Sequence, residues 1–302
     1  GLHNPRIVFT IHNLNYGVPL VAEAMTHCNK ATTVSPTYAL EVSGNEAISP
    51  HLDKFHGVIN GIDPDIWDPS IDPLLPMLYG PGTVKIGKQA AKQELRSRGN
   101  LGNRESPMVG VVTRLTKQKG IHLIKHAIYT ALARGCQVCL LGSAPDPEVQ
   151  KEFEEMAEDL RSQYWQDCRL FLYYDEALSH LIYAGSDLLL VPSMFEPCGL
   201  SQLIAMKYGT VPVVRRTGGL ADTVFDVDHD QARADWEGRE VNGFQFDGTD
   251  NEGMDYALHR AIDMWYDRRG EFETLQETCS AQDWSWSRPS IDYMELYHAA
   301  RK

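Results

Sequence analysis

The chain has 302 residues, 43% of them hydrophobic and 23% charged, a composition typical of a globular protein with room for two cores. Its formal net charge of −13 argues against nucleic acid as a partner, and no apolar run approaches the roughly 18 residues of a membrane span. The six cysteines show no spacing typical of a metal site, which favours a reducing compartment.

The first 62 residues predict three short strands, at 7–11, 31–34 and 57–59, with little helix between them. The chain begins at Gly1 without an initiator Met and enters the first of these strands almost at once. We therefore interpret residues 1–62 as the second half of a Rossmann-like domain whose first half is missing, and the sequence as a fragment. Residues 63–82 are crowded with Pro, Asp and Gly, which predicts an interdomain linker.

Residues 83–283 predict a second Rossmann-like unit, because from Met108 onward apolar runs alternate with helix-like stretches. Expected strands lie at 108–112, 137–141, 169–173, 187–191, 211–214 and 243–246, and expected helices at 122–133, 147–163, 177–184, 201–208 and 254–268. The tail, 284–302, predicts a helix that packs back on the first domain. For Trp284 and Trp286 we favour buried anchors between the domains over a platform for a glucan.

A carboxylate stands where one buried strand gives way to a helix: Glu196 follows the apolar run 187–192. The glycine at 199 would let backbone N–H groups of Cys198, Gly199, Leu200 and Ser201 approach a ligand closely. Ligands of open α/β sheets bind at this carboxyl edge. A carboxylate beside an anion-binding helix end suits a phosphorylated sugar.

Further loops leave the same edge of the expected sheet. Arg114 and Lys119 follow the strand 108–112 and could clamp a diphosphate, or could be two solvated loop charges. Tyr174 could stack on a base or simply pack, and His12, after the first strand, could face the same cleft or be structural. Small residues that free backbone N–H groups follow two other strands: Gly142, Ser143, Thr217, Gly218 and Gly219.

Two apparent motifs are rejected. Asp226, Asp228 and Asp230 have the spacing of a calcium loop, but Gln231 occupies the position that needs Gly, so we expect a solvated acidic loop and no metal. Cys198 has no His or Asp near it in sequence, which argues against covalent catalysis.

Taken together and in this order, several stretches resemble the bacterial-type glycogen synthases and plant starch synthases. They are Phe9-Thr10-Ile11-His12-Asn13-Leu14, Ala31–Pro36, Asn60–Asp63, Thr113–Gly120, Pro192–Leu200 and Arg216–Leu220. The resemblance covers essentially the whole chain, and residues 121–127 and 283–302 look most like class III starch synthases. It implies an α/β fold of the GT-B type, two Rossmann-like domains of which the first is incomplete here. The implied reaction moves glucose from ADP-glucose to the non-reducing end of an α-1,4-glucan, such as an amylopectin or amylose chain, with retention and without metal or cofactor.

The same resemblance implies residue roles. Arg114 and Lys119 would hold the diphosphate, Glu196 would bind hydroxyls of the donor glucose, and the Cys198–Leu200 backbone would cap a phosphate. Tyr174 matches an adenine-stacking Tyr, and His12 matches a His that lines the glucose pocket. The resemblance further implies the plastid stroma of chloroplast or amyloplast, with the transit peptide lost from this fragment, and association with other starch-synthesising enzymes.

Departures from the family pattern keep alternatives open. The donor-binding Lys-Thr-Gly-Gly-Leu motif of the first domain is absent, and Ile204 stands where related transferases have a second Glu. One alternative is a non-catalytic glucan-binding or scaffold protein derived from a synthase. Another keeps the chemistry but uses UDP-glucose, because a stacking Tyr accepts either base.

Overall fold

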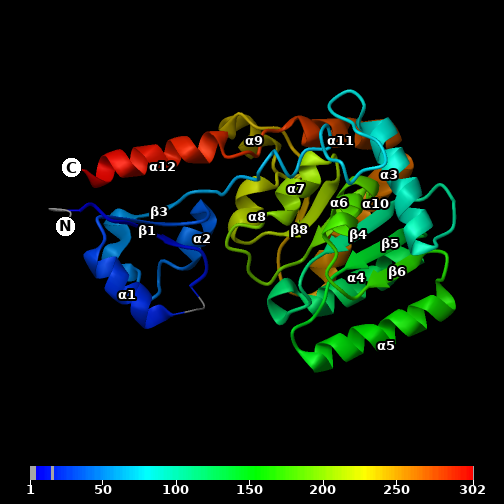
Figure 1. The fold of residues 1–302 in the computed structure, drawn as a ribbon, viewed down its shortest axis with the longest axis horizontal. Helices are drawn as coiled ribbons and strands as arrows, with labels where there is room; N and C mark the ends of the chain where they lie inside the picture. Colours follow the sequence, from blue (N-terminus) through cyan, green and yellow to red (C-terminus); the bar gives the residue numbers. More distant parts are fainter. Residues whose placement is uncertain (1–4, 15–16, 302) are drawn as a thin grey trace.

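The structure, a computed structural model, describes residues 5–14 and 17–301 and contains two parallel sheets (Figure 1). The smaller sheet has the order β1-β2-β3, formed by β1 (Val8–Ile11), β2 (Lys30–Thr33) and β3 (Phe55–Gly57). Its register pairs Val8 with Lys30 and Ala31 with Phe55. The third strand therefore begins two residues before the expected position.

The expectation of little helix in the first 62 residues is wrong. Helix α1 (Val18–His27) joins β1 to β2, and α2 (Pro36–Glu41) with the 3-10 turn η1 (Ser49–Lys54) joins β2 to β3. A proline in the first turn pre-sets the backbone of α1, and Val21 and Met25, one turn apart, are its buried residues. In α2 the hydroxyl of Ser35 accepts the Tyr38 N–H at 3.2 Å, an N-cap bond.

The larger sheet has six parallel strands in the order β6-β5-β4-β7-β8-β9, as the alternating pattern predicts. Their bounds are β4 (Met108–Val112), β5 (Gln137–Leu141), β6 (Cys168–Phe171), β7 (Leu188–Val191), β8 (Val211–Arg215) and β9 (Phe244–Phe246). Strands β5, β7 and β9 are buried along their whole length, so helices must cover both faces of the sheet. The α/β class is confirmed.

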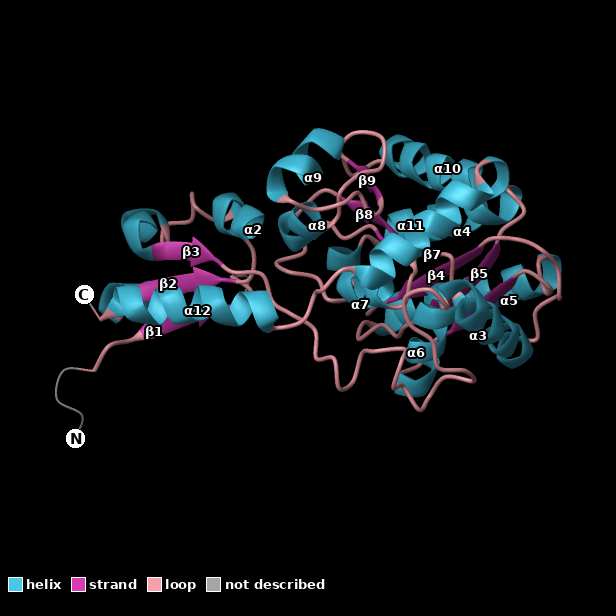
Figure 2. Ribbon diagram, turned by 90° about the horizontal axis from the view of Figure 1, so that it is seen from above, coloured by secondary structure: helices cyan, strands magenta, loops and turns pink. Residues whose placement is uncertain are grey.

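The helices of this unit form the two outer layers seen in Figures 1 and 2. They are α3 (Val84–Gly99), α4 (Ile121–Ala133), α5 (Pro147–Gln163), α6 (Glu176–Gly185), α7 (Ser201–Lys207), α8 (Gly218–Thr223), α9 (Gln231–Glu237), α10 (Asn251–Asp267) and α11 (Arg269–Ala281), with the 3-10 turn η2 (Lys117–Lys119). The sequence did not reveal α3, because one of its faces carries lysines and an arginine where a core-facing helix usually has apolar residues.

The last helix, α12 (Ser287–Ala300), returns to the smaller sheet, where it contacts β1 and β2 (Figure 2). The chain passes between the two units twice, near Ile62 and near Trp284. The backbone N–H of Ile62 donates to the carbonyl of Trp284 at 2.9 Å, so these two connecting segments run side by side. Trp284 is buried as expected, but Trp286 is 42% exposed and lies 6.5 Å from the ring of Tyr293. Burial of both tryptophans was therefore the wrong expectation.

Residues 63–82 are pinned to the larger unit by a buried polar cluster. Asp72 accepts hydrogen bonds from the Tyr208 hydroxyl at 2.6 Å and from His180 Nδ1 at 2.7 Å. The Trp67 ring stacks on His180 with 4.1 Å between centroids. Asp72, His180 and Tyr208 are buried, so their hydrogen bonds fix this segment in position against the larger unit.

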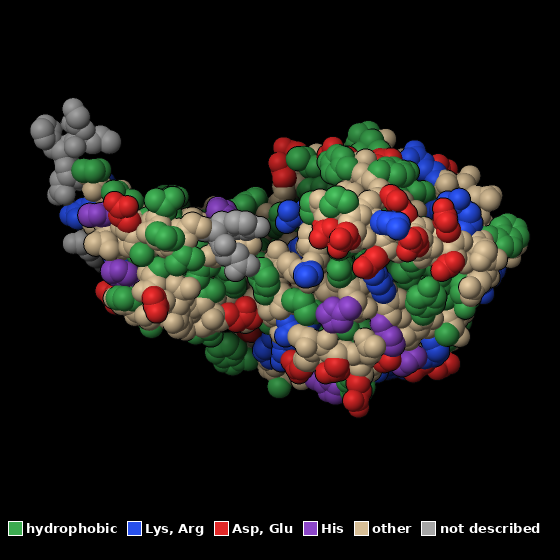
Figure 3. Space-filling model, turned by 90° about the horizontal axis from the view of Figure 1, so that it is seen from below, with side chains coloured by type: hydrophobic (Ala, Val, Ile, Leu, Met, Phe, Trp, Pro, Cys, Tyr) green, Lys and Arg blue, Asp and Glu red, His purple; other side chains and the backbone are tan. Residues whose placement is uncertain are grey.

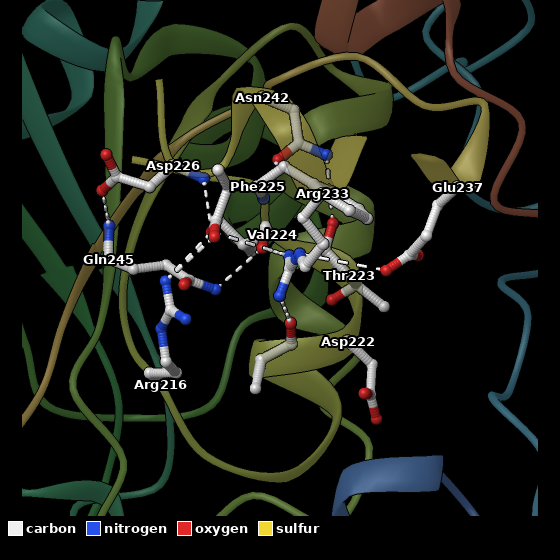
Figure 4. A network of polar contacts seen from close by, with 12 residues as sticks. Arg216, Asp222, Thr223, Val224, Phe225, Asp226, Arg233, Glu237, Asn242 and Gln245 are labelled. Atoms are coloured by element: carbon white, nitrogen blue, oxygen red, sulfur yellow. Dashed lines mark hydrogen bonds and ion pairs between the residues drawn. The ribbon is translucent and has the colours of Figure 1, made fainter. Parts of the chain in front are cut away.

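The aspartates that mimic a calcium loop form an ion-pair network with arginines (Figure 4). Asp226, 1% exposed, accepts two hydrogen bonds from Arg260 at 2.8 and 2.9 Å and one from the Gln245 N–H at 2.6 Å. Asp230 pairs with Arg216 at 3.1 Å and is also buried. The expected solvated acidic loop is therefore wrong for these two residues, since arginines from other elements neutralise them.

We expect acid to destabilise this unit through Asp226 and Asp187. Burial would raise the pKa of Asp226, but the Arg260 hydrogen bonds outweigh it and hold that pKa below 3.8. The pKa of Asp187 is lowered in the same way: burial alone would raise it, but the ion pair with Lys92 outweighs burial. Each depressed pKa contributes stability that is fully present above the pKa of the unfolded chain and is lost as the pH falls through the pKa of the folded state. Urea unfolding from pH 6 to pH 2.5 measures it, and a constant midpoint below pH 4 would contradict the expectation.

Candidate active site

The loops that follow β4 and β7 meet at the point where the order of the larger sheet reverses. From β4 the chain adds β5 and β6 on one side, then returns to add β7, β8 and β9 on the other. All strands are parallel, so their carboxyl ends share one edge, and a crevice opens between the diverging loops of β4 and β7. Ligands of such sheets bind at this switch point.

Lys119 and Glu196 form an ion pair across this switch point. The Lys119 ammonium lies 2.5 Å from Glu196 Oε2, which also accepts a hydrogen bond from the Ser193 hydroxyl at 2.9 Å. Glu196 is 7% exposed and Lys119 is partly buried. The sequence thus predicted two residues, 77 positions apart, that the fold brings into contact.

Gly120 permits this close approach. Its φ is +71°, and a Cβ there would lie 2.1 Å from the carbonyl oxygen of Pro192, at the end of β7. The two loops are also joined through Gln118, whose carbonyl accepts the Met194 N–H at 2.7 Å. A side chain at position 120 would push these loops apart and separate the ion pair.

Arg114 has a different environment from Lys119. It is exposed, and its guanidinium has no carboxylate partner among the described residues. The next residue, Leu115, donates its N–H to the carbonyl of Ser143 at 3.0 Å, which places the Gly142–Ser143 loop beside the loop after β4. Arg114 is therefore available to an incoming anion, while Lys119 is already paired.

A short turn, Pro197–Leu200, leads from Glu196 into α7, which begins at Ser201. Gly199 has φ +74° and is buried, Leu200 is 45% exposed, and Ser201 is the first helical residue. Helix starts leave backbone N–H groups without acceptors inside the helix. This turn is where the sequence predicts contacts to a phosphate, and that role stays a prediction.

Cys198 should be chemically inert. Burial raises the pKa of its thiol to about 12, so the thiolate fraction near pH 7 should lie on the order of a thousandfold below that of an ordinary thiol. We expect the native protein to resist iodoacetamide at Cys198, the urea-unfolded chain to react, and Cys198→Ser to keep its function. Rapid alkylation of native Cys198 at pH 7, followed by mass spectrometry, would contradict this.

The loop after β8 is occupied by the smaller unit. Glu41, the last residue of α2, accepts hydrogen bonds from the Thr217 hydroxyl at 3.0 Å and from the Gly218 N–H at 2.9 Å. The Gly219 N–H donates to the carbonyl of Glu196 at 3.0 Å. A ligand anion at this loop would have to replace Glu41, so Thr217 and Gly218 serve as a contact between the units, while the Gly219 N–H is bonded within the larger unit.

Sequence reasoning missed this contact between α2 and α8. Thr37 donates from both its N–H and its hydroxyl to Asp222, at 2.9 and 2.6 Å, and the Ser35 hydroxyl donates to the carbonyl of Pro197 at 2.6 Å. Burial raises the pKa of Asp222, against the opposing hydrogen bonds from Thr37. The only signal was Ser35-Pro36, a capping pair that starts a helix, and nothing in the sequence indicates its partner.

Two of the predicted site residues, Tyr174 and His12, lie away from the Lys119–Glu196 pair along the chain and the sheets. Tyr174 follows β6, the outermost strand on its side of the sheet, and is 84% exposed. His12 follows β1 at the carboxyl edge of the smaller sheet and is also exposed. Nearby, Leu14 and Phe195 line one hollow between the units. The structure thus brings Lys119, Glu196 and the Arg114 loop together and leaves Tyr174 and His12 exposed.

Within the described residues no cluster of His, Cys, Asp or Glu could hold a metal ion. Searched over the same part of the chain, no helix combines the length and apolar character that crossing a bilayer requires. On the face drawn in Figure 3, basic and acidic side chains are interspersed over the larger unit.

Comparison with known proteins gives one consistent family. The model of the group 1 glycosyl transferases matches residues 92–265. Starch synthase 3 of Arabidopsis thaliana is 62% identical over 302 residues, which is 100% of this chain and 29% of that protein. Glycogen synthase 2 of Methylococcus capsulatus is 39% identical and aligns with 100% of this chain and 69% of its own length.

A solved structure agrees with these relatives. The catalytic domain of starch synthase IV from Arabidopsis thaliana, bound to ADP and acarbose, superimposes with a TM-score of 0.91 at 40% identity. The match covers 98% of this chain and 67% of that one. The chain spans between 14% and 29% of the length of three plant starch synthase 3 proteins that it matches.

Proposed function

Since the chain belongs to the starch synthase and bacterial glycogen synthase family of group 1 glycosyltransferases, we propose that it is part of an ADP-glucose-dependent starch synthase. The protein would transfer glucose, with retention, to the non-reducing end of an α-1,4-glucan. The observation that carries this proposal is the Lys119–Glu196 pair beside an unpaired Arg114 at the switch point. This arrangement offers cations for a diphosphate and an acceptor for sugar hydroxyls in one crevice.

In the proposed reaction, the bond between the glucose anomeric carbon and the β-phosphate oxygen of ADP-glucose breaks, and a glucan hydroxyl takes the glucose. Negative charge builds on the departing ADP. Arg114 and Lys119 would stabilise that charge, and each such interaction is typically worth about 3 kcal/mol. Glu196, held by Ser193, would orient Lys119 and accept hydrogen bonds from glucose hydroxyls.

The remaining predicted residues would complete the donor site. We assign Tyr174 to the adenine ring and His12 to the glucose pocket, because both are exposed at the carboxyl edges of their sheets. The backbone of Cys198, Gly199, Leu200 and Ser201 would face a phosphate, and Gly142 and Ser143 would line the donor beside Arg114. Thr217 and Gly218 would join only in a state where Glu41 has moved away, and Gly219 only where its N–H has left the carbonyl of Glu196.

We also propose the division of the chain. Residues 1–62 would belong to the acceptor-side domain, 63–82 to the connection, 83–283 to the nucleotide-sugar domain, and 284–302 to the helix that returns to the first domain. The plant relatives are named chloroplastic or amyloplastic, which supports a plastid location, and we assign the stroma. Amylopectin or amylose chains would be the acceptor, and other starch-synthesising enzymes would be partners.

Transfer of labelled glucose to amylopectin by the full-length protein tests the function. We expect incorporation from ADP-glucose and much less from UDP-glucose. Preference for UDP-glucose would overturn the assigned donor but keep the chemistry. Binding of amylopectin without incorporation from either donor would overturn the enzyme in favour of a scaffold protein.

A further inference from the structure

A hollow of about 500 Å³ lies at the amino edge of the larger sheet, at the opposite end of the strands from the candidate active site. Its wall includes Asp187, which directly precedes β7 and accepts the N–H of Met108, the first residue of β4, at 2.7 Å. A strand of five residues separates the two edges by about 16 Å. The hollow is therefore a separate feature of the larger unit.

The lining is strongly basic in a chain whose net charge is −13. Its basic side chains are Lys85, Lys88, Lys92, Arg96, Arg104 and Arg269, against the three carboxylates of Glu105, Asp187 and Glu273. Four of the six come from α3, at positions 85, 88, 92 and 96, a spacing of three or four that places them on one helix face. The apolar positions Val84, Ala91 and Leu95 of the same helix pack in the core.

Two of these cations are buried without a carboxylate partner. Lys88, 5% exposed, donates to the carbonyls of Ala184 and Tyr208 and to the Thr210 hydroxyl. Arg96, 8% exposed, donates Nε–H to the Gln137 side chain at 2.8 Å and one Nη2–H to the carbonyl of Arg104 at 2.5 Å.

The other N–H groups of the Arg96 guanidinium have no acceptor among the described residues. Beside these two buried cations, the partly buried Lys92 is neutralised by Asp187 at 2.5 Å. Buried charge without a partner is costly, and a bound anion would compensate it.

Two further donors in the wall lack acceptors. Trp265, 4% exposed, and Gln276, 7% exposed, have buried Nε1 and Nε2 atoms that find no hydrogen-bond partner in the part of the chain that the structure describes. Both are donors, as are all six basic side chains. Lys85 and Arg269 pair with Glu273, and Arg104 pairs with Asp167, which leaves Lys88 and Arg96 as the cations of the wall without a carboxylate partner among the described residues. An acceptor-rich anion would balance their charge and the unpaired donors.

We propose that this hollow is a binding site for a small phosphorylated anion, with the phosphoryl group held by Arg96 and flanked by Lys92 and Arg269. Lys92 also pairs with Asp187, and Arg269 with Glu105 and Glu273. Arg presents a planar fork and Lys a point charge to phosphate oxygens. The volume exceeds that of a bare phosphate, so it also admits the sugar of a hexose phosphate. This site is additional to the proposed function and independent of it.

The state of Lys88 supports this site. Burial lowers the pKa of Lys88 to about 7, while Asp187 opposes that change and Lys92 adds to it. Lys88 is therefore only partly charged near neutral pH. An anion placed in the hollow would favour the charged ammonium, so that binding and protonation would support one another.

Calorimetric titration of the chain at pH 7 with inorganic phosphate, glucose 1-phosphate and unphosphorylated glucose tests the site. We expect both phosphates to bind and Arg96→Gln to weaken binding about tenfold to a hundredfold, because it removes a charged hydrogen bond. Tighter binding of glucose 1-phosphate identifies a sugar phosphate as the ligand, and tighter binding of inorganic phosphate identifies the free ion.

Matched variants separate this hollow from the candidate active site and from a folding defect. Arg114→Gln, at the carboxyl edge, should leave the Arg96-dependent binding unchanged. If circular dichroism shows that Arg96→Gln does not fold, the rim variant Arg269→Gln should weaken binding about two- to fivefold. Equal phosphate affinity in the wild type and the folded hollow variants, or equal affinity for unphosphorylated glucose, would overturn the proposal.

Discussion

Glu196→Gln should lower kcat for glucose transfer from ADP-glucose by about a hundredfold to a thousandfold in the full-length protein. Glutamine keeps the size of the side chain but removes the charge that pairs with Lys119 at 2.5 Å. Lys119 would then be free to change position, and the sugar hydroxyls would lose a charged acceptor. Initial rates over a range of ADP-glucose concentrations separate the loss of kcat from any change in KM.

Lys117→Gln provides the matched control for this variant. Lys117 lies in the same loop as Lys119 but is exposed, and it has no ion-pair partner among the described residues. We expect its kcat to stay within about twofold of the wild type, since exposed charges contribute little. A Glu196→Gln protein that folds normally and keeps more than a tenth of the wild-type kcat would contradict the role assigned to Glu196.

Asp226→Ala should destabilise the larger unit by about 3–5 kcal/mol, the cost of removing one partner of a buried ion pair. Arg260 would keep its charge in a partly buried site, and the Gln245 N–H would lose its acceptor. These contacts join the segment after α8 to β9 and α10, and Figure 4 shows Asp226 beside Gln245. The urea midpoint of the 302-residue chain, followed by circular dichroism, measures the loss.

Asp228→Ala is the control, because the same Arg260 pairs with Asp228 at 2.6 Å. The side chain of Asp228 is 37% exposed, against 1% for Asp226. Solvent screens the exposed pair, so its removal should cost less than about 1 kcal/mol. Equal destabilisation by the two substitutions would show that burial of Asp226 is not the cause.

The sequence predicted those parts of the fold that local pattern determines. Apolar runs alternating with helices from Met108 onward gave the six parallel strands, because a strand buried on both faces must be apolar along its length. Helix α3 escaped detection because its face toward the hollow is cationic. Helix α1 was missed because its buried stripe is only Val21 and Met25.

In the candidate site, too, local sequence pattern predicted some residues, whereas contacts between residues far apart in the sequence could not be predicted. Arg114, Lys119 and Glu196 could be predicted because each follows a strand, and parallel strands end at one edge. The contact of Glu41 with Gly218 could not, since the two residues are 177 positions apart and neither stands in a pattern that indicates the other. The neutralisation of Asp226 by Arg260 was hidden for the same reason.

Amide hydrogen exchange of the full-length protein with and without ADP tests the central claim most directly, that the carboxyl-edge loops after β4 and β7 hold the nucleotide diphosphate. We expect ADP to slow exchange in residues 113–120 and 193–201, and to leave residues 85–104, beside the basic hollow, unchanged. Slower exchange confined to residues 85–104, or no change in either carboxyl-edge loop at saturating ADP, would contradict the claim.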